Sequence, residues 1–231
     1  MTVPDVARVA ASIEAACVKA GRDPKSVRLL AVTKQVPTPA IRQAADLGVS
    51  LFGENRVQEA REKANQGAYE GSTLCLIGHL QSNKASLAAR LFDEVHSVDS
   101  LRIADALNKA SSRYRTAPLP VLIEVNAGED PAKFGVLPGS VKELAFAVME
   151  MPGLALRGLM TVAPGYGDAE LARSAFRRLR QARDELRDAG IPADSLRELS
   201  MGMSGDYEIA ISEGSTIVRI GTALFGPRKA R

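Results

Sequence analysis

Eight short apolar runs recur along this chain, and each is separated from the next by a longer segment with helical spacing. Between the sixth and seventh runs, apolar residues follow a helical period at Leu171, Ala175, Leu179, Ala182 and Leu186. Strands that alternate with helices in this way predict a parallel sheet. The eight runs cover residues 28–33, 50–52, 73–77, 94–98, 120–126, 154–160, 196–200 and 216–220.

Two architectures fit a parallel sheet of this kind: a closed barrel and an open sheet with helices on both faces. The length of 231 residues is ordinary for a (β/α)8 barrel, and no Gly-x-Gly-x-x-Gly motif follows the first run. We therefore expect an α/β fold: a single (β/α)8 TIM-type barrel domain over residues 1–231. An amphipathic segment at 6–20 predicts an extra helix at its amino terminus.

The charge balance and the cysteines exclude several classes of protein. The 30 basic and 27 acidic residues give a net charge of +3 and are spread along the chain, so we expect no nucleic-acid partner. The arginine-rich stretch 173–187 also contains acids and an apolar stripe, which indicates a solvated helix face. No apolar stretch approaches the roughly 20 residues that span a bilayer. Cys17 and Cys75 lie in apolar contexts and no signal sequence is evident, so we expect a reduced, cytoplasmic protein without a membrane anchor.

Polar residues and glycines gather directly after the predicted strands. They include Lys34 after the first run, 53–55 after the second, 78–84 after the third and 200–206 after the seventh. The amino-terminal ends of the runs look bland by comparison. In a closed parallel barrel the carboxyl ends of the strands share one mouth, which carries the chemistry of this fold. The sequence therefore predicts a functional site at that mouth.

An amine and an anion site are expected to meet there. The first and last strands of a closed barrel are neighbours, so Lys34 lies near the loops after the seventh and eighth strands. Those loops contain Ser204 with Gly205, and Gly221 with Thr222. They are the habitual phosphate site of such barrels, because helix-end N–H groups and dipoles neutralise an anion. A lysine amine beside a phosphate site is what pyridoxal phosphate needs.

Each of these features also has a simpler interpretation. A lysine after a strand is usually the first solvated residue. Ser204 can be only the cap of the helix that follows it, and the glycines can simply permit tight turns. Because the three features fall in loops that become contiguous only on closure, their coincidence favours the functional interpretation.

Arg219 lies inside the last run, where alternation places it on one face with Ile217 and Gly221. A parallel strand covered by helices leaves neither face to water, so this arginine needs a partner. One interpretation is a buried ion pair with Glu124 or Glu198. The other directs the guanidinium at the ring nitrogen of a pyridine. Because arginine only donates hydrogen bonds, it would keep that nitrogen unprotonated and weaken the ring as an electron sink.

The histidines do not suggest a metal site. His79 and His96 follow or end the third and fourth runs, and no cysteine or carboxylate set stands at ligand spacing from them. No Ser, His and Asp grouping suggests a hydrolase either. We therefore expect no bound metal.

Six ordered segments of the chain resemble the pyridoxal-phosphate homeostasis protein family, whose barrel is similar to the amino-terminal barrel of alanine racemase. Together they run over almost the whole chain, and six motifs in order are far more specific than any one alone. The segments are Leu-Ala-Val-Thr-Lys at 30–34, Phe-Gly-Glu-Asn at 52–55, Ile-Gly-His-Leu-Gln-Ser-Asn-Lys at 77–84, Gly-Leu-Met at 158–160, Leu-Ser-Met-Gly-Met-Ser at 199–204 and Val-Arg-Ile-Gly-Thr at 218–222.

The resemblance implies a role for each residue of the mouth. Lys34 would form the imine with the cofactor, pyridoxal 5'-phosphate, and Arg219 would face the pyridine nitrogen. Asn55 would line the pocket. The phosphate would be held by the loops after the seventh and eighth strands, through Ser204, Gly205, Gly221 and Thr222.

The chain departs from the family pattern at four positions. Arg56 replaces an aromatic residue after Gly-Glu-Asn, and Cys75 stands where a histidine commonly precedes the Ile-Gly pair. Thr33 replaces a frequent serine before the lysine, and Gln35 a frequent threonine or asparagine after it. These changes concern the surroundings of the pocket and leave the expected cofactor contacts intact.

The resemblance implies a carrier rather than an enzyme. An alanine racemase takes a second acid/base group, a tyrosine, from a carboxyl-terminal β domain of its partner subunit, and this chain ends at Arg231 without such a domain. With Arg219 disfavouring a carbanion, we expect racemisation to be absent or vestigial. We expect a monomer that holds the cofactor for vitamin B6 homeostasis and delivers it to apo pyridoxal-phosphate enzymes. The alternatives are a small pyridoxal-phosphate racemase and a Schiff-base aldolase that acts on a phosphorylated sugar.

Overall fold

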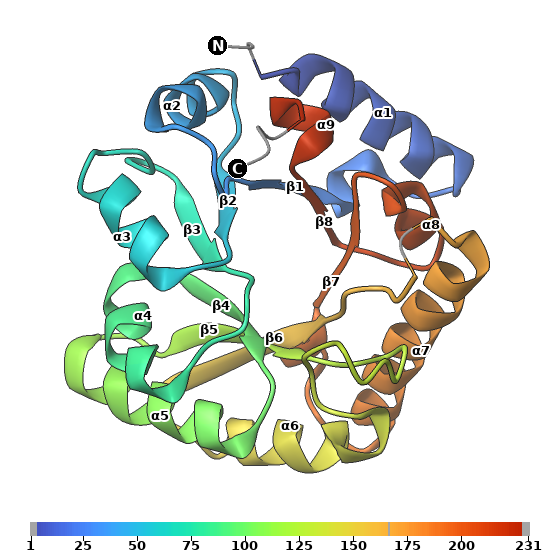
Figure 1. Cartoon of the computed structure of the whole chain (residues 1–231). Coiled ribbons are helices and arrows are strands. Elements are labelled where there is room, and N and C mark those ends of the chain that lie inside the picture. Colours follow the sequence, from blue (N-terminus) through green and yellow to red (C-terminus); the bar gives the residue numbers. More distant parts are fainter. Residues whose placement is uncertain (1–3, 166, 228–231) are drawn as a thin grey trace.

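The predicted strands close into a barrel. The computed structural model describes residues 4–165 and 167–227, in which eight parallel strands follow one another around the barrel in chain order (Figure 1). The barrel closes where β1 pairs with β8, with Leu30 opposite Arg219 and Ala31 opposite Ile220. The (β/α)8 fold is therefore confirmed. The strands are β1 (Arg28–Val32), β2 (Leu51–Glu54), β3 (Thr73–Leu76), β4 (Glu94–Val98), β5 (Leu119–Glu124), β6 (Leu154–Met160), β7 (Glu198–Met203) and β8 (Ile217–Ile220).

Helices surround the barrel, and the amino-terminal one, α1 (Val6–Lys19), agrees with the predicted segment at 6–20. Short 3-10 turns, η1 (Pro24–Ser26), η2 (Ser82–Lys84), η3 (Pro138–Ser140) and η4 (Ala193–Leu196), lie in the connections. The other helices are α2 (Thr38–Asp46), α3 (Val57–Ala64), α4 (Ala85–Leu91), α5 (Leu101–Tyr114), α6 (Val141–Met149), α7 (Ala169–Asp188), α8 (Tyr207–Ser212) and α9 (Thr222–Phe225).

Two strands continue beyond the ends that the sequence predicts. β2 runs on to Glu54 instead of ending at residue 52, and β7 spans Glu198–Met203 instead of 196–200. Each continues through a glycine, which interrupts the apolar run but allows close packing. A Cβ added to Gly53 would lie 2.4 Å from a methyl carbon of Leu30. Gly202 has φ +94°, and the register between β7 and β8 shifts at this point.

Alternate strand residues face the helices or the inside of the barrel. The outward residues join the main core beneath the helices, as Ala31, Phe52 and Leu76 do. A second, smaller cluster fills the inside of the barrel, as expected for this fold. This apolar layer lies between the two open ends of the barrel. It comprises Leu30, Val32, Leu51, Cys75 and Ile217, with Ile77 packed against it.

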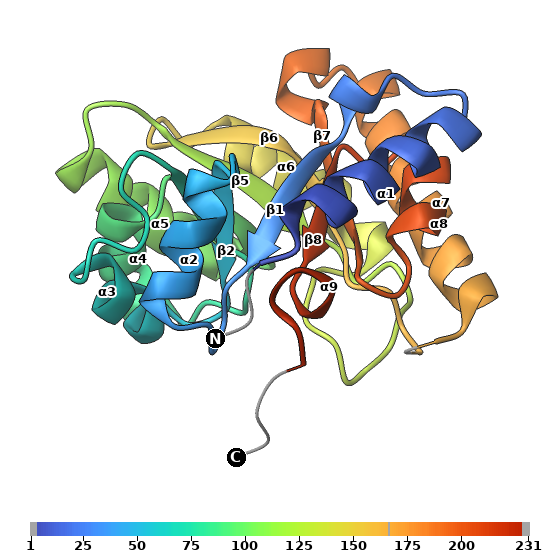
Figure 2. The same cartoon turned by 90° about the horizontal axis from the view of Figure 1, so that it is seen from above.

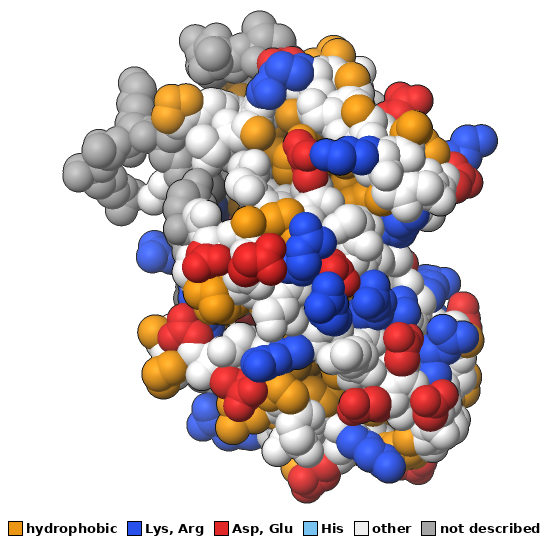
Figure 3. Space-filling view, turned by 90° about the vertical axis from the view of Figure 1, so that its right-hand side faces the viewer, with side chains coloured by type: hydrophobic (Ala, Val, Ile, Leu, Met, Phe, Trp, Pro, Cys, Tyr) orange, Lys and Arg blue, Asp and Glu red, His pale blue; other side chains and the backbone are white. Residues whose placement is uncertain are grey.

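The arginine-rich stretch is a helix face, as predicted. It belongs to α7, whose amino terminus is capped by the Asp168 side chain. Arg173, Arg177 and Arg180 all form ion pairs with Glu213, which lies just after α8. Figure 3 shows basic and acidic side chains interspersed over the side of the molecule that faces right in Figure 1. Among residues 4–165 and 167–227, no helix is long and apolar enough to cross a membrane.

Candidate functional site

The first and last strands bring Lys34 and Gly221 to the same end of the barrel. β1 and β8 are parallel and paired, so the residues that follow them leave the barrel side by side. In Figure 2 the arrowhead of β1 points to the side on which α9 lies. Lys34 itself is half-buried. The predicted proximity of the loops after the first and last strands is thus confirmed.

The backbone on both sides of Lys34 is held in a defined turn. Thr33 is fully buried, and its N–H donates to the carbonyl of Gly53 at 2.9 Å. Gln35 adopts φ 62°, a left-handed conformation that is uncommon for a residue with a side chain. Its N–H donates to Glu59 Oε1 at 2.6 Å. The turn therefore depends on a main-chain carbonyl of β2 and a side chain of α3 as well as on its own residues.

A buried polar network underlies this turn. The Lys63 ammonium donates to the Thr33 carbonyl at 2.6 Å and to Glu54 Oε1 at 2.7 Å. A third bond joins it to Glu59 Oε1 at 2.7 Å. Glu54 Oε1 also accepts the Thr33 hydroxyl and the Tyr69 hydroxyl, each at 2.8 Å. The network thus joins the backbone next to Lys34 to the end of β2 and to α3.

The ionisation of this network follows from its burial and contacts. Burial opposes the ionisation of Glu59, but its hydrogen bonds with Lys63 and the Gln35 amide outweigh burial and hold its pKa below the ordinary value. Burial, reinforced by the Glu54 carboxylate, raises the pKa of Tyr69 far above its ordinary value. Tyr69 is therefore a neutral donor at physiological pH.

Sequence reasoning did not assign roles to Glu54, Glu59, Lys63 or Tyr69. Glu54 belongs to the Phe-Gly-Glu-Asn segment, and a carboxylate at the end of an apolar strand is a signal that a partner is required. The partners could not be found in the same way, because Lys63 looks like any lysine of an amphipathic helix. Its burial to 8% exposure appears only once α3 packs on the barrel.

The loops after β7 and β8 also meet, and Ser204 takes part in the contact between them. Its hydroxyl does not cap α8. The N-cap position of α8 is Asp206, and the Ser204 oxygen instead accepts the N–H of Ala223 in α9 at 3.4 Å. This bond joins the loop after β7 to the start of α9, and its two residues are 19 positions apart in the sequence. Ser204 therefore lies beside the segment of Gly221 and Thr222, as expected from closure of the barrel, and the simpler interpretation of Ser204 as the cap of α8 does not hold.

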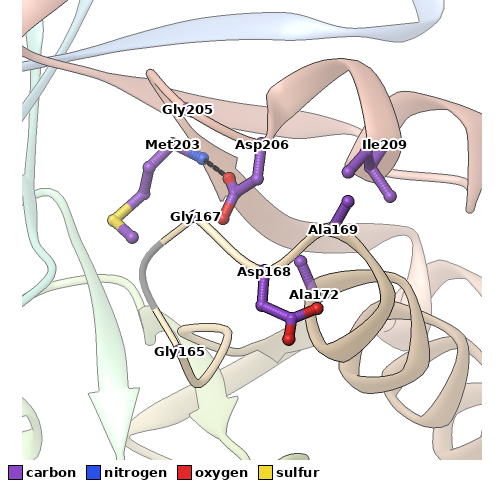
Figure 4. Close-up of a pocket in the computed structure, with 9 residues that line it drawn as sticks. All are labelled: Gly165, Gly167, Asp168, Ala169, Ala172, Met203, Gly205, Asp206 and Ile209. Carbon is purple, nitrogen blue, oxygen red and sulfur yellow. Dashed lines mark hydrogen bonds between the residues drawn. The ribbon is translucent and has the colours of Figure 1, made fainter.

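Asp206 shapes the turn that carries Ser204 and Gly205. Its Oδ1 accepts the N–H of Met203 at 2.5 Å (Figure 4). The N–H of Asp206 donates to the Met203 carbonyl at 3.1 Å. Burial raises the pKa of this carboxyl, and the Met203 amide partly opposes that rise. A pocket lies beside the turn, between the β6–α7 and β7–α8 connections. It is lined by Gly165, Gly167, Asp168, Ala169, Ala172, Met203, Gly205, Asp206 and Ile209.

Arg219 faces the inside of the barrel and is bound mainly by main-chain oxygens. One guanidinium nitrogen donates to the carbonyl of Ser200 at 2.6 Å and to its hydroxyl at 3.0 Å. The other terminal nitrogen donates to the carbonyl of Thr161 at 2.8 Å. Burial lowers the pKa of Arg219 to about 10, so the group is still a cation at neutral pH.

The ion pair considered for Arg219 is not formed within the described part of the chain. Glu198 instead pairs with Arg28 at 2.8 Å, at the other end of its strand. Glu124 acts on Arg219 only through its charge, which raises the arginine pKa against the effect of burial. Strand alternation identified the buried face correctly, but the partners are backbone carbonyls, which a sequence does not display.

Asn55 lies at the end of β2 in a half-buried position. Its Oδ1 is shielded from water and has no hydrogen-bond partner among the described residues. The backbone of Asn55 also packs closely on Gly78, where an added Cβ would lie 2.3 Å from the Asn55 carbonyl oxygen. The Asn55 side chain therefore lies at the mouth with an amide oxygen that no described protein group binds.

The opposite side of the mouth carries two carboxyls and an aromatic stack. The ring of His79 stacks on Phe134 at 3.9 Å, and its Nδ1 lies 2.9 Å from Asp99 Oδ2. Glu124, at the end of β5, is 6% exposed. Burial, with repulsion from Asp99, raises the pKa of Glu124 to about 7, although Arg219 opposes the rise. This carboxyl therefore titrates near neutrality.

The barrel and this mouth define a class, the alanine-racemase-like barrels with a lysine after the first strand. The family described as "Alanine racemase, N-terminal domain" matches residues 5–229. The chain is 41% identical over 225 residues to the "Pyridoxal phosphate homeostasis protein" of Aquifex aeolicus, covering 97% of both chains. It is 42% identical to the protein of that name in Escherichia coli K12, covering 97% of this chain and 95% of the relative. The chain therefore belongs to the alanine racemase N-terminal domain family and, within it, to the pyridoxal phosphate homeostasis proteins.

Solved structures agree with this assignment. PipY of Synechococcus elongatus PCC7942, with PLP bound, superposes with a TM-score of 0.81 at 37% identity, covering 94% of this chain and all of PipY. Alanine racemase of Corynebacterium glutamicum superposes with a TM-score of 0.71 at 17% identity, covering 99% of this chain and 63% of the racemase. The racemase likeness shows a common fold. The predicted family is confirmed.

Proposed function

We propose that this chain binds pyridoxal 5'-phosphate at the barrel mouth, with Lys34 as the point of covalent attachment. It then serves vitamin B6 homeostasis by passing the cofactor to apoenzymes. The pairing of β1 with β8 is the observation that carries the proposal, because it places a lysine beside the loops of Ser204 and Gly221. The names of the relatives and the PLP-bound structure of PipY support the same cofactor.

The residues present fit this group. Lys34 offers an amine on a turn whose backbone is fixed from both sides. Asn55 offers a shielded acceptor that no described protein group uses. Ser204, Gly205, Gly221 and Thr222 gather where two loops meet, and a phosphate there can take hydrogen bonds from hydroxyl and backbone donors. We assign these four residues to the phosphate and Arg219 to the pyridine nitrogen.

The cofactor would supply an aldehyde that an amine can attack, and the residues of the mouth determine how the bound group behaves. Lys34 attaches the group, and the phosphate loops keep it oriented. Arg219 has a pKa of about 10 and only donates hydrogen bonds, so at neutral pH it would hydrogen-bond to a ring nitrogen without giving up its proton. The site therefore holds its ligand without increasing the ability of the ring to accept electrons.

The contacts of Tyr69 argue against racemisation, the alternative function. A racemase needs a second acid/base group on the opposite face of its substrate. Tyr69, the tyrosine of the network under Lys34, donates its hydroxyl to Glu54 and has a strongly raised pKa, so it is unsuited to accept a proton. The contacts of Tyr69 support the non-catalytic role that we propose.

The attachment of the cofactor can be tested directly. Purified protein mixed with pyridoxal phosphate should develop a visible absorption band, and borohydride should fix the cofactor on Lys34, which peptide mass spectrometry would locate. Lys34→Ala should lose both signals while keeping its fold. Lys84→Ala is the matched control, because Lys84 is also a half-buried lysine of a loop at the mouth. A fixed adduct that survives in Lys34→Ala would move the site to another lysine.

A further inference from the structure

The amino-terminal end of the barrel holds a second polar cluster, formed by Cys75, Glu94 and His96. Cys75 of β3 and Glu94 of β4 are register partners, and His96 lies two residues further along β4, on the same face as Glu94. Each side chain offers one ligand atom, and these atoms lie within 4.8 Å of one another. The spacing of residues along the chain predicted no metal site at His96 and no functional site at the amino-terminal ends of the strands. The pairing of two strands produces a donor set that this spacing does not reveal.

The distances are close to those of a metal centre. Glu94 Oε2 lies 2.8 Å from His96 Nε2 and 3.8 Å from Cys75 Sγ. Ligand atoms bound tetrahedrally to zinc at about 2.0–2.3 Å lie roughly 3.3–3.8 Å apart. The pair of Cys75 and Glu94 already has this separation, and the pair of His96 and Glu94 needs to widen by only about half an ångström.

The imidazole is not satisfied by the protein alone. His96 is fully buried, and its Nδ1 has no hydrogen-bond partner among the described residues. A buried polar atom without a partner costs about 1–3 kcal/mol, so such atoms are uncommon unless a ligand or ion completes them. An ion bound to Nε2 beside Glu94 would not complete Nδ1, so this nitrogen shows unused hydrogen-bonding capacity of the imidazole, and the metal site rests on the donor distances.

Charge and access agree with a divalent cation. A thiolate and a carboxylate together balance two positive charges, so a loaded site adds no net charge beside the apolar neighbours Leu30 and Ile217. Arg28 acts on Glu94 through its charge, but it is already paired with Glu198 at 2.8 Å. The Glu94 side chain is 23% exposed, whereas His96 is closed off, so an ion can enter past the carboxylate.

We propose that Cys75, Glu94 and His96 bind a borderline-soft divalent cation, with zinc favoured by the S, N and O donor set. The ion would join β3 to β4 at the amino-terminal end of the barrel, with water in the fourth position. Cys75 belongs to the apolar cluster inside the barrel and Glu94 is the first residue of β4, whereas Lys34 follows the carboxyl end of β1. The proposal therefore does not depend on the cofactor.

Cobalt is a suitable probe because it reports a thiolate ligand by absorption. The protein as purified, with and without pyridoxal phosphate, would be titrated with Co²⁺ and then with Zn²⁺. We expect one Co²⁺ per chain, a thiolate-to-metal charge-transfer band, and displacement of this band by Zn²⁺. Zn²⁺ should also raise the melting temperature. Cys17→Ala should behave like the unchanged protein, since Cys17 is a second fully buried cysteine that belongs to α1.

Two variants decide the outcome. Cys75→Ala should lose the charge-transfer band and bind more than about 100-fold more weakly, and Glu94→Gln should weaken binding at least about tenfold. Glu94→Gln keeps the size of the side chain, so it guards against a loss of fold in the cysteine variant. The proposal is wrong if Cys75→Ala retains the band or the zinc-dependent rise in melting temperature. It is equally wrong if the folded, unchanged protein shows no band with Co²⁺.

Discussion

The Lys63 ammonium contacts three oxygens at once, and two of them belong to carboxylates. Glu54 has no exposed surface, so its charge depends on Lys63 and on two hydroxyl donors for compensation. A buried carboxylate that loses its cation is far more costly than an exposed one, because water cannot replace the lost partner. The position of Lys34 therefore depends on a lysine that never has to touch the cofactor.

Lys63→Met should reduce the free energy of unfolding by about 3–5 kcal/mol, because it leaves Glu54 buried without a cation. It should also slow the formation of the borohydride-fixed adduct at Lys34, since the Thr33 carbonyl loses its donor. Urea unfolding and the rate of adduct formation would measure the two effects.

Lys109→Met provides the matched control. Lys109 and Asp105 lie at the same 2.7 Å separation, but their side chains are 74% and 51% exposed. Exposed pairs contribute no more than about 1 kcal/mol. The double variant Lys63→Met with Glu54→Gln should recover part of the lost stability, because it removes the unpaired charge. Equal losses in the Lys63 and Lys109 variants would show that the buried network does not support the turn.

At the scale of elements, the strand order could be predicted and the strand ends could not. The order follows from the alternation of apolar runs and helical segments, because the periodicity of each segment can be read from its own residues. The end of β7 depends on Gly202, whose left-handed backbone and close contact with Ala210 belong to the folded barrel. The same distinction explains Ser204. Closure of the barrel brings the two loops together. Which amide donates to the Ser204 hydroxyl depends on where α9 begins.

The loops after β7 and β8 offer a test of the phosphate assignment. Ser204→Ala removes a hydroxyl that can donate to a charged acceptor, a bond worth about 1.5–3 kcal/mol. The variant should therefore bind pyridoxal phosphate roughly 10- to 150-fold more weakly, whereas its affinity for pyridoxal without the phosphate should change little. Equilibrium dialysis with both ligands would measure the difference.

Ser212→Ala is the control for this experiment. Ser212 is the last residue of α8, and its hydroxyl donates to the Ile209 carbonyl at 2.7 Å, away from the two loops. The Ser212→Ala variant should bind both ligands as tightly as the unchanged protein does. If Ser204→Ala weakened both ligands equally, the serine would contribute to the pocket without contacting the phosphate.

At the scale of the whole molecule, the barrel separates two kinds of chemistry. The mouth combines the amine of Lys34, the Arg219 cation and the loops that we assign to the phosphate, and the amino-terminal end combines a thiol, an imidazole and a carboxylate. The first could be predicted, because residues at the carboxyl ends of parallel strands share one edge wherever they lie in the chain. The second could not, since it requires the register of β3 against β4.

A carrier and a racemase differ in what they do with an amino acid. Arg219 keeps its proton at neutral pH and the Tyr69 hydroxyl donates to Glu54. We therefore expect neither residue to promote the removal of an α-proton. Loaded protein mixed with L-alanine in deuterated water should therefore show at most slow exchange of the α-proton. Nuclear magnetic resonance would measure the rate of this exchange. The same loaded protein should activate an apo pyridoxal-phosphate enzyme faster than free cofactor does at the same concentration. Exchange on the order of 10 per second, an ordinary enzymatic rate, would instead identify a racemase, and activation no faster than that by free cofactor would reduce the role to storage.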